Sequence, residues 1–375
     1  MKIKTFRLGE LGKMIVGGDK PTVFSKDKTE DCPIPIFSNG LENDGLYGYT
    51  DKARVKDSCL TISARGTVGA VFFRKEPFLP IVRLIAFVPN LKLIDAKYLY
   101  YYLSISHLDG FGTSQQQITA PYLSRIKISI FEDIKYQHRI ASILSAYDNL
   151  IENNNKRIRL LELMAENLYK EWFVRFRFPG HEKTEFENVL PKGWKIVCLS
   201  DYIDIIMGQS PESKYYNKEK EGLPFHQGVG SYGNFYLVDE VYATKGKKIA
   251  APNSIIFSVR APVGRLNITL NKIILGRGVA SMNAKDKKNS FLFWMLKNIF
   301  SKEDIIGNGS IFTSVTKDEL FKLKITLPSN DVRNEFDMIG DSIEKEIRSL
   351  SLNNENLSRQ RDLLLPRLMS GKLEV

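Results

Sequence analysis

The chain is poor in the features that mark secreted, disulfide-bonded or membrane proteins. Its 375 residues include three cysteines, Cys32, Cys59 and Cys198, and an odd, scattered set indicates reduced thiols rather than a disulfide framework. No apolar run reaches the roughly 18 residues that a membrane span needs, and no signal segment opens the sequence. We therefore expect a cytoplasmic protein without a transmembrane helix.

Signatures of catalysis are missing as well. The sequence has no Gly-Lys-Ser/Thr phosphate loop, which argues against ATP hydrolysis. It has no two adjacent prolines, so it lacks the Asn/Asp-Pro-Pro-aromatic motif with which amino-methylating enzymes hold a flipped base. The four histidines are separated from other metal ligands along the sequence, and no nucleophile elbow is present. We expect a chain with no catalytic, metal or cofactor site.

One glycine fingerprint, Gly228 to Gly233, has the spacing of a dinucleotide-binding turn. Such a turn needs a helix after it, whose N-terminus meets the pyrophosphate. Here the strand-like segment 234–238 follows instead. We interpret the fingerprint as a loop.

Positive charge, by contrast, is in excess. Lys and Arg number 54 against 43 Asp and Glu, a formal net charge of +11. Clustered cations bind polyanions by releasing counterions, so this excess favours a nucleic acid as partner. A solvated basic surface without such a partner is the alternative.

The chain also contains an internal repeat with an offset of about 195 residues. Residues 62–69 (ISARGTVG) return as 257–264 (FSVRAPVG), residues 83–86 as 277–280, and residues 112–119 as 309–316. Short apolar runs with Gly, Pro and Asn between them predict strands, while 96–104 and 290–297 predict one helix in each copy.

The fold class is therefore α+β, with two similar mixed α/β domains. We predict a first domain over 1–133, a central spacer helix over 134–176, a linker over 177–193, a second domain over 194–330 and a C-terminal spacer helix over 331–375.

Each copy is followed by a long helix with apolar residues at heptad spacing, which is typical of a coiled coil. The seam in the two helices consists of Ile140, Leu144, Tyr147, Ile151, Asn154, Ile158, Leu161, Leu168, Phe336, Ile343, Ile347, Leu350, Leu357 and Leu364.

Neither helix could bury such a seam alone, so we expect the two to pair as an antiparallel coiled coil with pseudo-two-fold symmetry. Packing of each helix on its own domain, or homodimerisation, remains open. Asn154 would fix the register at some cost in stability. Gly340, Asn354 and Arg361 interrupt the second seam, where we expect looser pairing.

Candidate contacts to nucleic acid fall into two classes. Arg65 and Arg260, like Arg83 and Arg277, occupy equivalent positions in the copies; they could contact phosphates or brace turns. Residues that differ between copies are candidates for reading base edges, because Gln and Asn pair with adenine and Thr can meet the thymine methyl group; solvated loops are the alternative. This second class comprises Ser38, Asn39, Ser114, Gln115, Gln116, Gln117, Gln227 and Thr313. Tyr215 and Tyr232 could lie against sugars or phosphates, or close a loop, and Gln209, Ser231 and Ser310 are further candidate contacts to DNA.

Several segments, in the same order along the whole chain, resemble the specificity subunit of Type I restriction–modification systems. They are Ile62–Gly69, Glu171–Gly180 (EWFVRFRFPG), Leu190–Trp194 (LPKGW), Met207–Pro211 (MGQSP), Ser258–Gly264, Gly276–Ala280 (GRGVA) and Leu365–Leu368 (LPRL).

The resemblance implies that each repeat is a target-recognition domain reading one half of a split site in double-stranded DNA. It also implies helices that act as spacer and docking surface for two methyltransferase subunits, restriction subunits that complete the complex, and no S-adenosylmethionine or ATP bound by this chain. About 40 helical residues at roughly 1.5 Å each would span about 60 Å, more than one DNA turn of about 34 Å. The alternative is a coiled-coil interaction protein that binds other proteins without DNA sequence specificity.

Overall fold

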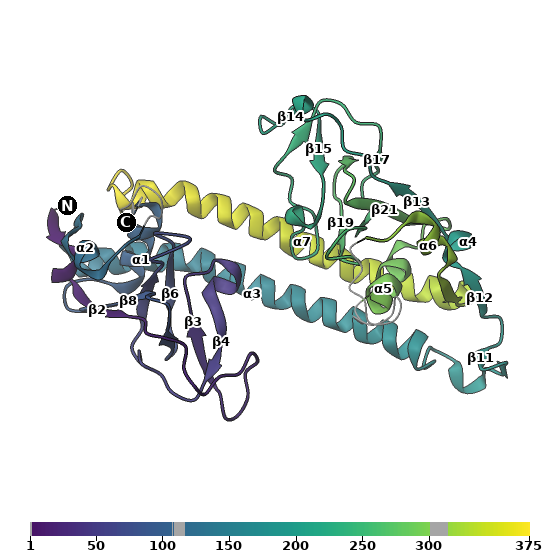
Figure 1. The fold of residues 1–375 in the computed structure, drawn as a ribbon, viewed down its shortest axis with the longest axis horizontal. Coiled ribbons are helices and arrows are strands. Elements are labelled where there is room, and N and C mark those ends of the chain that lie inside the picture. The colour runs from purple at the N-terminus through teal and green to yellow at the C-terminus, as the bar shows by residue number, and fades with distance from the viewer. Residues whose placement is uncertain (1, 107, 109–116, 301–313) are drawn as a thin grey trace. The chain divides into compact units, whose positions relative to one another are not determined.

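The chain folds into two units, each built from a mixed α/β domain and parts of two long helices (Figure 1). The computed structural model describes residues 2–106, 108, 117–300 and 314–375. The first unit is Met1–Asn154 with Leu352–Val375, and the second is Asn155–Ser351. Among the described residues, none of the helices has the length and apolar composition of a membrane span.

The domain of the first unit contains three small sheets. Strands β1 (Ile3–Arg7) and β9 (Lys127–Phe131) pair antiparallel. An antiparallel sheet has the order β2 (Gly12–Val16), β8 (Ile85–Pro89), β5 (Cys59–Ile62) and β6 (Val71–Arg74). The third sheet joins β4 (Leu46–Thr50), β3 (Ile34–Phe37) and β7 (Leu79–Pro80), with β3 and β7 parallel. Helices α1 (Ala96–Ile105) and α2 (Ala120–Arg125) complete it.

The domain of the second unit repeats this arrangement. Strands β12 (Lys195–Cys198) and β22 (Lys324–Leu327) pair, and a second sheet has the order β13 (Ile203–Met207), β21 (Val279–Ala284), β18 (Ile255–Ser258) and β19 (Leu266–Ile268). The third has the order β14 (Tyr216–Asn217), β16 (Tyr242–Ala243), β15 (Leu223–His226), β20 (Ile273–Leu275) and β17 (Ile249–Ala250). The helices are α4 (Leu199–Tyr202), α5 (Asn289–Phe300) and α6 (Lys317–Lys322), and the hairpin β10 (Phe186–Glu187) and β11 (Leu190–Pro191) precedes them. The predicted pair of mixed α/β domains is therefore confirmed.

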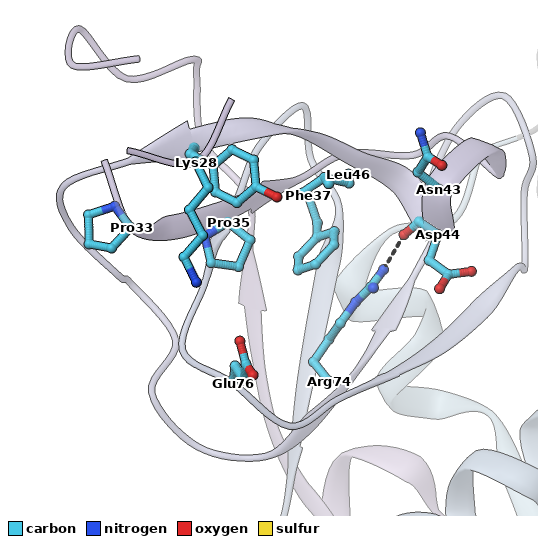
Figure 2. A pocket seen from close by; sticks show the side chains of 10 residues that line it. Lys28, Pro33, Pro35, Phe37, Asn43, Asp44, Leu46, Arg74 and Glu76 are labelled. Carbon is cyan, nitrogen blue, oxygen red and sulfur yellow. Dashed lines mark hydrogen bonds between the residues drawn. The ribbon is translucent and has the colours of Figure 1, made fainter. Parts of the chain in front are cut away.

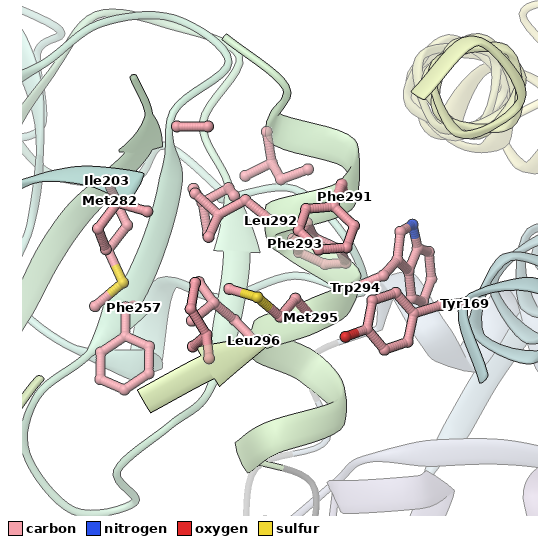
Figure 3. Close-up of a cluster of buried hydrophobic side chains, with 14 of the residues drawn as sticks. Tyr169, Ile203, Phe257, Met282, Phe291, Leu292, Phe293, Trp294, Met295 and Leu296 are labelled. Carbon is pink, nitrogen blue, oxygen red and sulfur yellow. The ribbon is translucent and has the colours of Figure 1, made fainter. Parts of the chain in front are cut away.

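Helix α5 forms the centre of the second unit's core. Its residues 290–296 (SFLFWML) are all buried, as expected for a helix that is apolar nearly all round. Figure 3 shows these side chains among Ile203, Phe257, Met282 and Tyr169, which belong to the same buried cluster. Asp337 on α7 caps the helix by accepting a hydrogen bond from the Phe291 N–H (2.9 Å).

The long helices are α3 (Ile134–Tyr169), continued by a π-helical turn over Lys170–Val174, and α7 (Asn330–Met369). In the second unit Arg157 Nη2 lies 2.7 Å from Glu346 Oε1, and the Trp172 ring lies 5.8 Å from that of Phe336. In the first unit Arg361 Nη1 lies 2.6 Å from Asp148 Oδ1. Residue numbers thus rise on one helix as they fall on the other, which is the predicted antiparallel pairing.

The predicted seam residues lie at least partly buried along these helices. Eight of them are buried: Ile140, Leu144, Asn154, Ile158, Phe336, Ile343, Ile347 and Leu350. The half-buried members are Tyr147, Ile151, Leu161, Leu168, Leu357 and Leu364.

The three interruptions of the seam are packing sites rather than gaps. A side chain at Gly340 would place its Cβ 2.0 Å from Ser290 Oγ, so glycine lets α5 approach α7. Asn354 Oδ1 accepts a hydrogen bond of 2.9 Å from buried Asn154. Arg361 pairs with Asp148. Burial alone would lower the pKa of Arg361, but the hydrogen bonds that it donates to Asp148 and Asp362 outweigh burial and raise that pKa. The expected looser pairing is not what these contacts indicate.

Candidate nucleic-acid interface

In the first unit, loops from distant parts of the sequence meet at the ends of the strands. The Ile81 N–H donates to the Phe37 carbonyl (3.0 Å), the Gly17 N–H to the Leu84 carbonyl (2.8 Å) and the Ile118 N–H to the Ala64 carbonyl (3.0 Å). We call this arrangement the strand-end junction. It comprises Gly17–Gly18, Phe37–Gly40, Ala64–Gly69, Ile81–Leu84 and Gln117–Ile118.

The second unit builds the same junction from the corresponding residues. The Gly276 N–H donates to the His226 carbonyl (2.8 Å), the Gly208 N–H to the Val279 carbonyl (3.0 Å) and the Val315 N–H to the Val259 carbonyl (2.9 Å). Its segments are Gly208–Gln209, His226–Gly228, Val259–Gly264, Gly276–Val279 and Ser314–Val315. The correspondence is made by backbone groups, so it holds although the side chains differ.

Each junction contains two of the arginines singled out in the sequence. Arg65 and Arg260 occupy equivalent positions, but the equivalence predicted for Arg83 and Arg277 is wrong by one residue, because the strand pairs Ile62–Ile85 and Phe257–Ala280 and the equivalent backbone bonds match Arg277 to Val82. Arg65 is half-exposed, and its Nη2 donates to Gln117 Oε1 (3.1 Å). Arg83, Arg260 and Arg277 are exposed, and none of the four forms an ion pair within the described part of the chain. Cations without carboxylate partners at an exposed loop junction are available to phosphates.

The Asn39 side chain forms hydrogen bonds within the first junction. Its Nδ2 donates to the Val82 carbonyl (2.6 Å), and its Oδ1 accepts from the Ala64 N–H (2.8 Å). These bonds tie together the segments that carry Arg65 and Arg83. Asn39 therefore positions the two arginines, and its contact with a base stays a prediction.

The other candidates have varied surroundings. Gln209 and Gln227 are exposed, whereas Ser38 and Gln117 are half-exposed. Tyr215 is not part of the junction segments, and the ammonium groups of Lys245 and Lys214 lie 4.9 and 5.1 Å from its ring centre. The Tyr232 hydroxyl is buried, which raises its pKa. Ser114, Gln115, Gln116, Ser310 and Thr313 lie outside the described residues.

Sequence reasoning missed Arg74, which supports the loop that continues from the first junction after Gly40. This loop includes Asn43, Asp44 and Gly45 with φ of 48°, 55° and 80°, a conformation that needs support. The buried Arg74 guanidinium donates to the Asp44 carbonyl and lies 3.7 Å from the centre of the Phe37 ring. Figure 2 shows it at the edge of a cavity of about 310 Å³. Burial lowers the pKa of Arg74 to about 10, so it stays charged at neutral pH.

His226 is the second residue that was missed, because the sequence presents it as isolated. Its Nδ1 lies 2.8 Å from Ser231 Oγ and its Nε2 lies 2.9 Å from Asp239 Oδ1. The Asn271 amide donates to the other oxygen of Asp239 (2.6 Å). Aligning the repeat segments 34–37 (IPIF) and 223–226 (LPFH) places His226 opposite Phe37. This difference between the two copies is the signal by which the sequence could have pointed to His226 as a support of the second loop.

Ser231, His226 and Asp239 resemble a hydrolytic triad in composition only. The Ser231 hydroxyl lies within hydrogen-bonding distance of both the Gly228 carbonyl (3.2 Å) and His226 Nδ1 (2.8 Å). The His226 side chain is 0% exposed, which closes it to substrate. The geometry therefore indicates a loop anchor rather than a nucleophile.

Comparisons with known proteins give the family. The family profile described as "Type I restriction modification DNA specificity domain" matches residues 2–163 and 191–337, more than half of the chain. The MjaX type I restriction enzyme specificity subunit of Methanocaldococcus jannaschii is 32% identical over 323 residues, covering 83% of this chain and 76% of that protein. The MjaIX specificity subunit of the same organism is 24% identical, covering 96% and 88%.

The fold is that of a solved member of this group. The crystal structure of the Type I restriction–modification S subunit from M. genitalium matches with a TM-score of 0.62 at 16% identity, covering 98% of this chain and 96% of that one. Two family segments, each with its own strand-end junction, account for the internal repeat. The chain belongs to the Type I restriction–modification DNA specificity family, the subunits that supply sequence-specific DNA recognition in these systems.

Proposed function

We propose that this chain is a non-catalytic subunit that reads an asymmetric, split DNA site, with domain 1–133 reading one half and domain 194–330 the other. The observation that carries the proposal is the strand-end junction built twice with the same backbone bonds and different side chains. Arginines at both junctions supply contacts to phosphates in both halves, while the residues that differ supply base discrimination. Half-sites on one duplex are held at a fixed spacing by a stiff connector.

We assign the reading of base edges to the residues that differ between the two junctions. Ser38 and Gln117 belong to the first junction, whereas Gln209 and Gln227 belong to the second. Replacing Gln115, Gln116 and Gln117 together by Ala is expected to change the first half of the recognised site and leave the second intact, because base contacts specify and phosphate contacts position. Equal loss of binding to every sequence would make these glutamines phosphate contacts or scaffold.

The long helices provide a surface for partner subunits. Leu160, Leu163 and Met164 on α3 are 65%, 52% and 57% exposed, and their i, i+3, i+4 spacing puts them on one helix face. A contiguous apolar face on an exposed helix is typical of a protein interface. We propose that methyltransferase subunits dock on the helices, two per complex, and that restriction subunits join to complete the assembly.

The test is to co-express the chain with the methyltransferase encoded beside it in a methylation-free host and map methylated adenines across the genome. A split, asymmetric motif is expected, and exchanging residues 1–133 for those of a relative should change one half of it. A complex that forms without any motif would refute the proposal and favour an interaction protein that lacks sequence specificity.

A further inference from the structure

The first junction contains a turn whose backbone conformation does not suit its residues. The turn Ile81–Leu84 is closed by a hydrogen bond from the Leu84 N–H to the Ile81 carbonyl (3.0 Å). Its two central residues, Val82 and Arg83, have φ of 52° and 61°. Positive φ at both central positions is the geometry of a type I′ turn, for which Asn and Gly are the usual residues. A β-branched valine is strained in this conformation.

Hydrogen bonds to neighbouring segments hold the turn in this conformation. The Val82 N–H donates to the Gly18 carbonyl (2.8 Å), and the Arg83 N–H donates to the Gly17 carbonyl (3.2 Å). The Val82 carbonyl accepts from Asn39 Nδ2 (2.6 Å). A strained conformation persists only where its surroundings impose it. All these bonds use the backbone of the turn, so glycine or asparagine could form them, and the turn itself does not require a valine.

The hydrophobic core does not require the Val82 side chain either. Val82 is 52% exposed and belongs to none of the hydrophobic clusters in the described part of the chain. Arg83 follows it directly, and the Asn39 side chain that holds Val82 also accepts from the Ala64 N–H (2.8 Å), next to Arg65. An exposed apolar side chain thus lies in a junction whose cations are available to phosphates. The strain and the exposure together favour a contact outside the chain, with the nucleic acid that these cations attract.

The second junction presents a different side chain at the same backbone position. There the Gly276 N–H forms the bond that the Ile81 N–H forms in the first junction, which matches the exposed Arg277 to Val82. The position is therefore apolar in one domain and cationic in the other. Such a position is suited to discriminating bases, because base edges differ in whether they offer hydrogen-bond acceptors or a methyl group.

We propose that Val82 is a specificity-determining residue of the first domain, which packs against the 5-methyl group of a thymine in the major groove. The inference rests on the split-site function proposed above. The thymine methyl is the apolar group that the major groove presents, and an apolar side chain recognises it by contact. The first half-site should therefore contain an A·T pair at the position that Val82 meets.

The experiment uses the methyltransferase complex and fluorescein-labelled duplexes carrying the mapped motif. Each thymine of the motif is replaced in turn by deoxyuridine, which removes the 5-methyl group and leaves the hydrogen-bonding edges intact. We expect one replacement in the first half-site to raise the Kd of the wild type about fourfold, the effect of one methyl group removed from water. Val82→Gly should bind the intact motif about fourfold more weakly and should lose nothing further from that replacement, because a shared contact is lost only once.

Stability and a matched control separate this contact from a structural role. Val82→Gly and Val82→Asn should unfold in urea at the same or a higher midpoint by circular dichroism, because both residues accept positive φ; a structural role would lower the midpoint. Val189 is also a valine at positive φ (72°) and is 85% exposed, but it lies in the hairpin between β10 and β11. Val189→Gly should leave every Kd unchanged.

Several results would overturn the proposal. They are a first half-site without an A·T pair, a wild type that tolerates deoxyuridine throughout the first half, and a Val82→Gly variant that keeps the wild-type sensitivity. Loss of methyltransferase co-purification by Val82→Gly would also overturn it, by making Val82 a contact to protein. A wild type that yields no split motif would instead refute the split-site function itself.

Discussion

Replacing Glu344 by Gln should stabilise the second unit at alkaline pH and leave it unchanged at acidic pH. The side chain lies on α7, and its Oε1 is buried without a hydrogen-bond partner in the described structure. The pKa of Glu344 is raised to about 7, mainly by burial and to a smaller extent by the neighbouring carboxylates Asp341 and Asp337. The folded protein therefore holds a proton here that the unfolded chain releases near the ordinary glutamate pKa of 4.5.

The direction of the effect follows from proton linkage. Because the folded state binds the proton more tightly, the stability from this group is fully present below pH 4.5 and is lost as the pH rises to about 7. One pKa unit corresponds to about 1.4 kcal/mol, so the difference between 4.5 and about 7 gives a loss of at most about 3.5 kcal/mol by pH 8. Gln keeps the shape of the protonated side chain and has no charge to bury, so the variant should avoid this loss.

Tryptophan fluorescence is a suitable assay, because all three tryptophans, Trp172, Trp194 and Trp294, lie in the second unit. Urea unfolding at about pH 5 should give similar midpoints for wild type and Glu344→Gln, while at pH 8 the variant should unfold at higher urea. The control is Glu346→Gln on the same helix, which removes an exposed pair with Arg157 and should cost at most about 1 kcal/mol at pH 8. Equal stability of wild type and Glu344→Gln at pH 8 would refute the reasoning.

Three further changes test the helices. Gly340→Ala should destabilise the second unit by about 1–3 kcal/mol in urea unfolding, because its Cβ would lie 2.0 Å from Ser290 Oγ. Adding Ser290→Gly should restore part of the lost stability, and a double variant as unstable as Gly340→Ala alone would contradict this contact. Leu163→Lys should abolish co-purification with the methyltransferase while circular dichroism stays unchanged, and retained binding would move the docking face elsewhere. Inserting four residues at Asn153–Asn155 adds about 6 Å of helix and should lengthen the mapped spacer by about two base pairs; an unchanged spacer in an active complex would exclude a ruler.

The architecture was predictable because it rests on short-range or repeated patterns. Heptad spacing identified both long helices, and the offset repeat identified two similar domains. The reasons for the interruptions of the seam were not predictable. Gly340 depends on the approach of α5, and Arg361 depends on Asp148, which is 213 residues away. A heptad pattern registers such residues as defects, because it contains no information about the element packed against them.

The candidate site was predictable to the extent that it is repeated. The four arginines stood out because the repeat aligns them, and the structure places two in each junction. Only Arg65 and Arg260 are equivalent in the strand register, since a one-residue difference matches Arg277 to Val82. Arg74 and His226 are unique to their own copies, so the repeat could mark His226 only as a difference from Phe37 and could not give the role of either residue. The partners of His226 lie on a loop whose path is set by tertiary contacts, and Asn271, 32 residues beyond Asp239, completes the network.

Backbone groups hold each junction together, whereas side chains distinguish the two junctions, and this difference limits how DNA specificity can change. The junction is held by N–H and carbonyl groups of the backbone, which every residue except proline supplies in full. Side chains such as those of Ser38 and Gln227 can therefore vary without loss of the frame that presents them. The supporting residues below the loops are less free, because Arg74 and His226 each satisfy several buried groups at once. A domain that acquires a new target should thus change its exposed loop residues first, and should exchange a loop anchor only together with the loop that it holds.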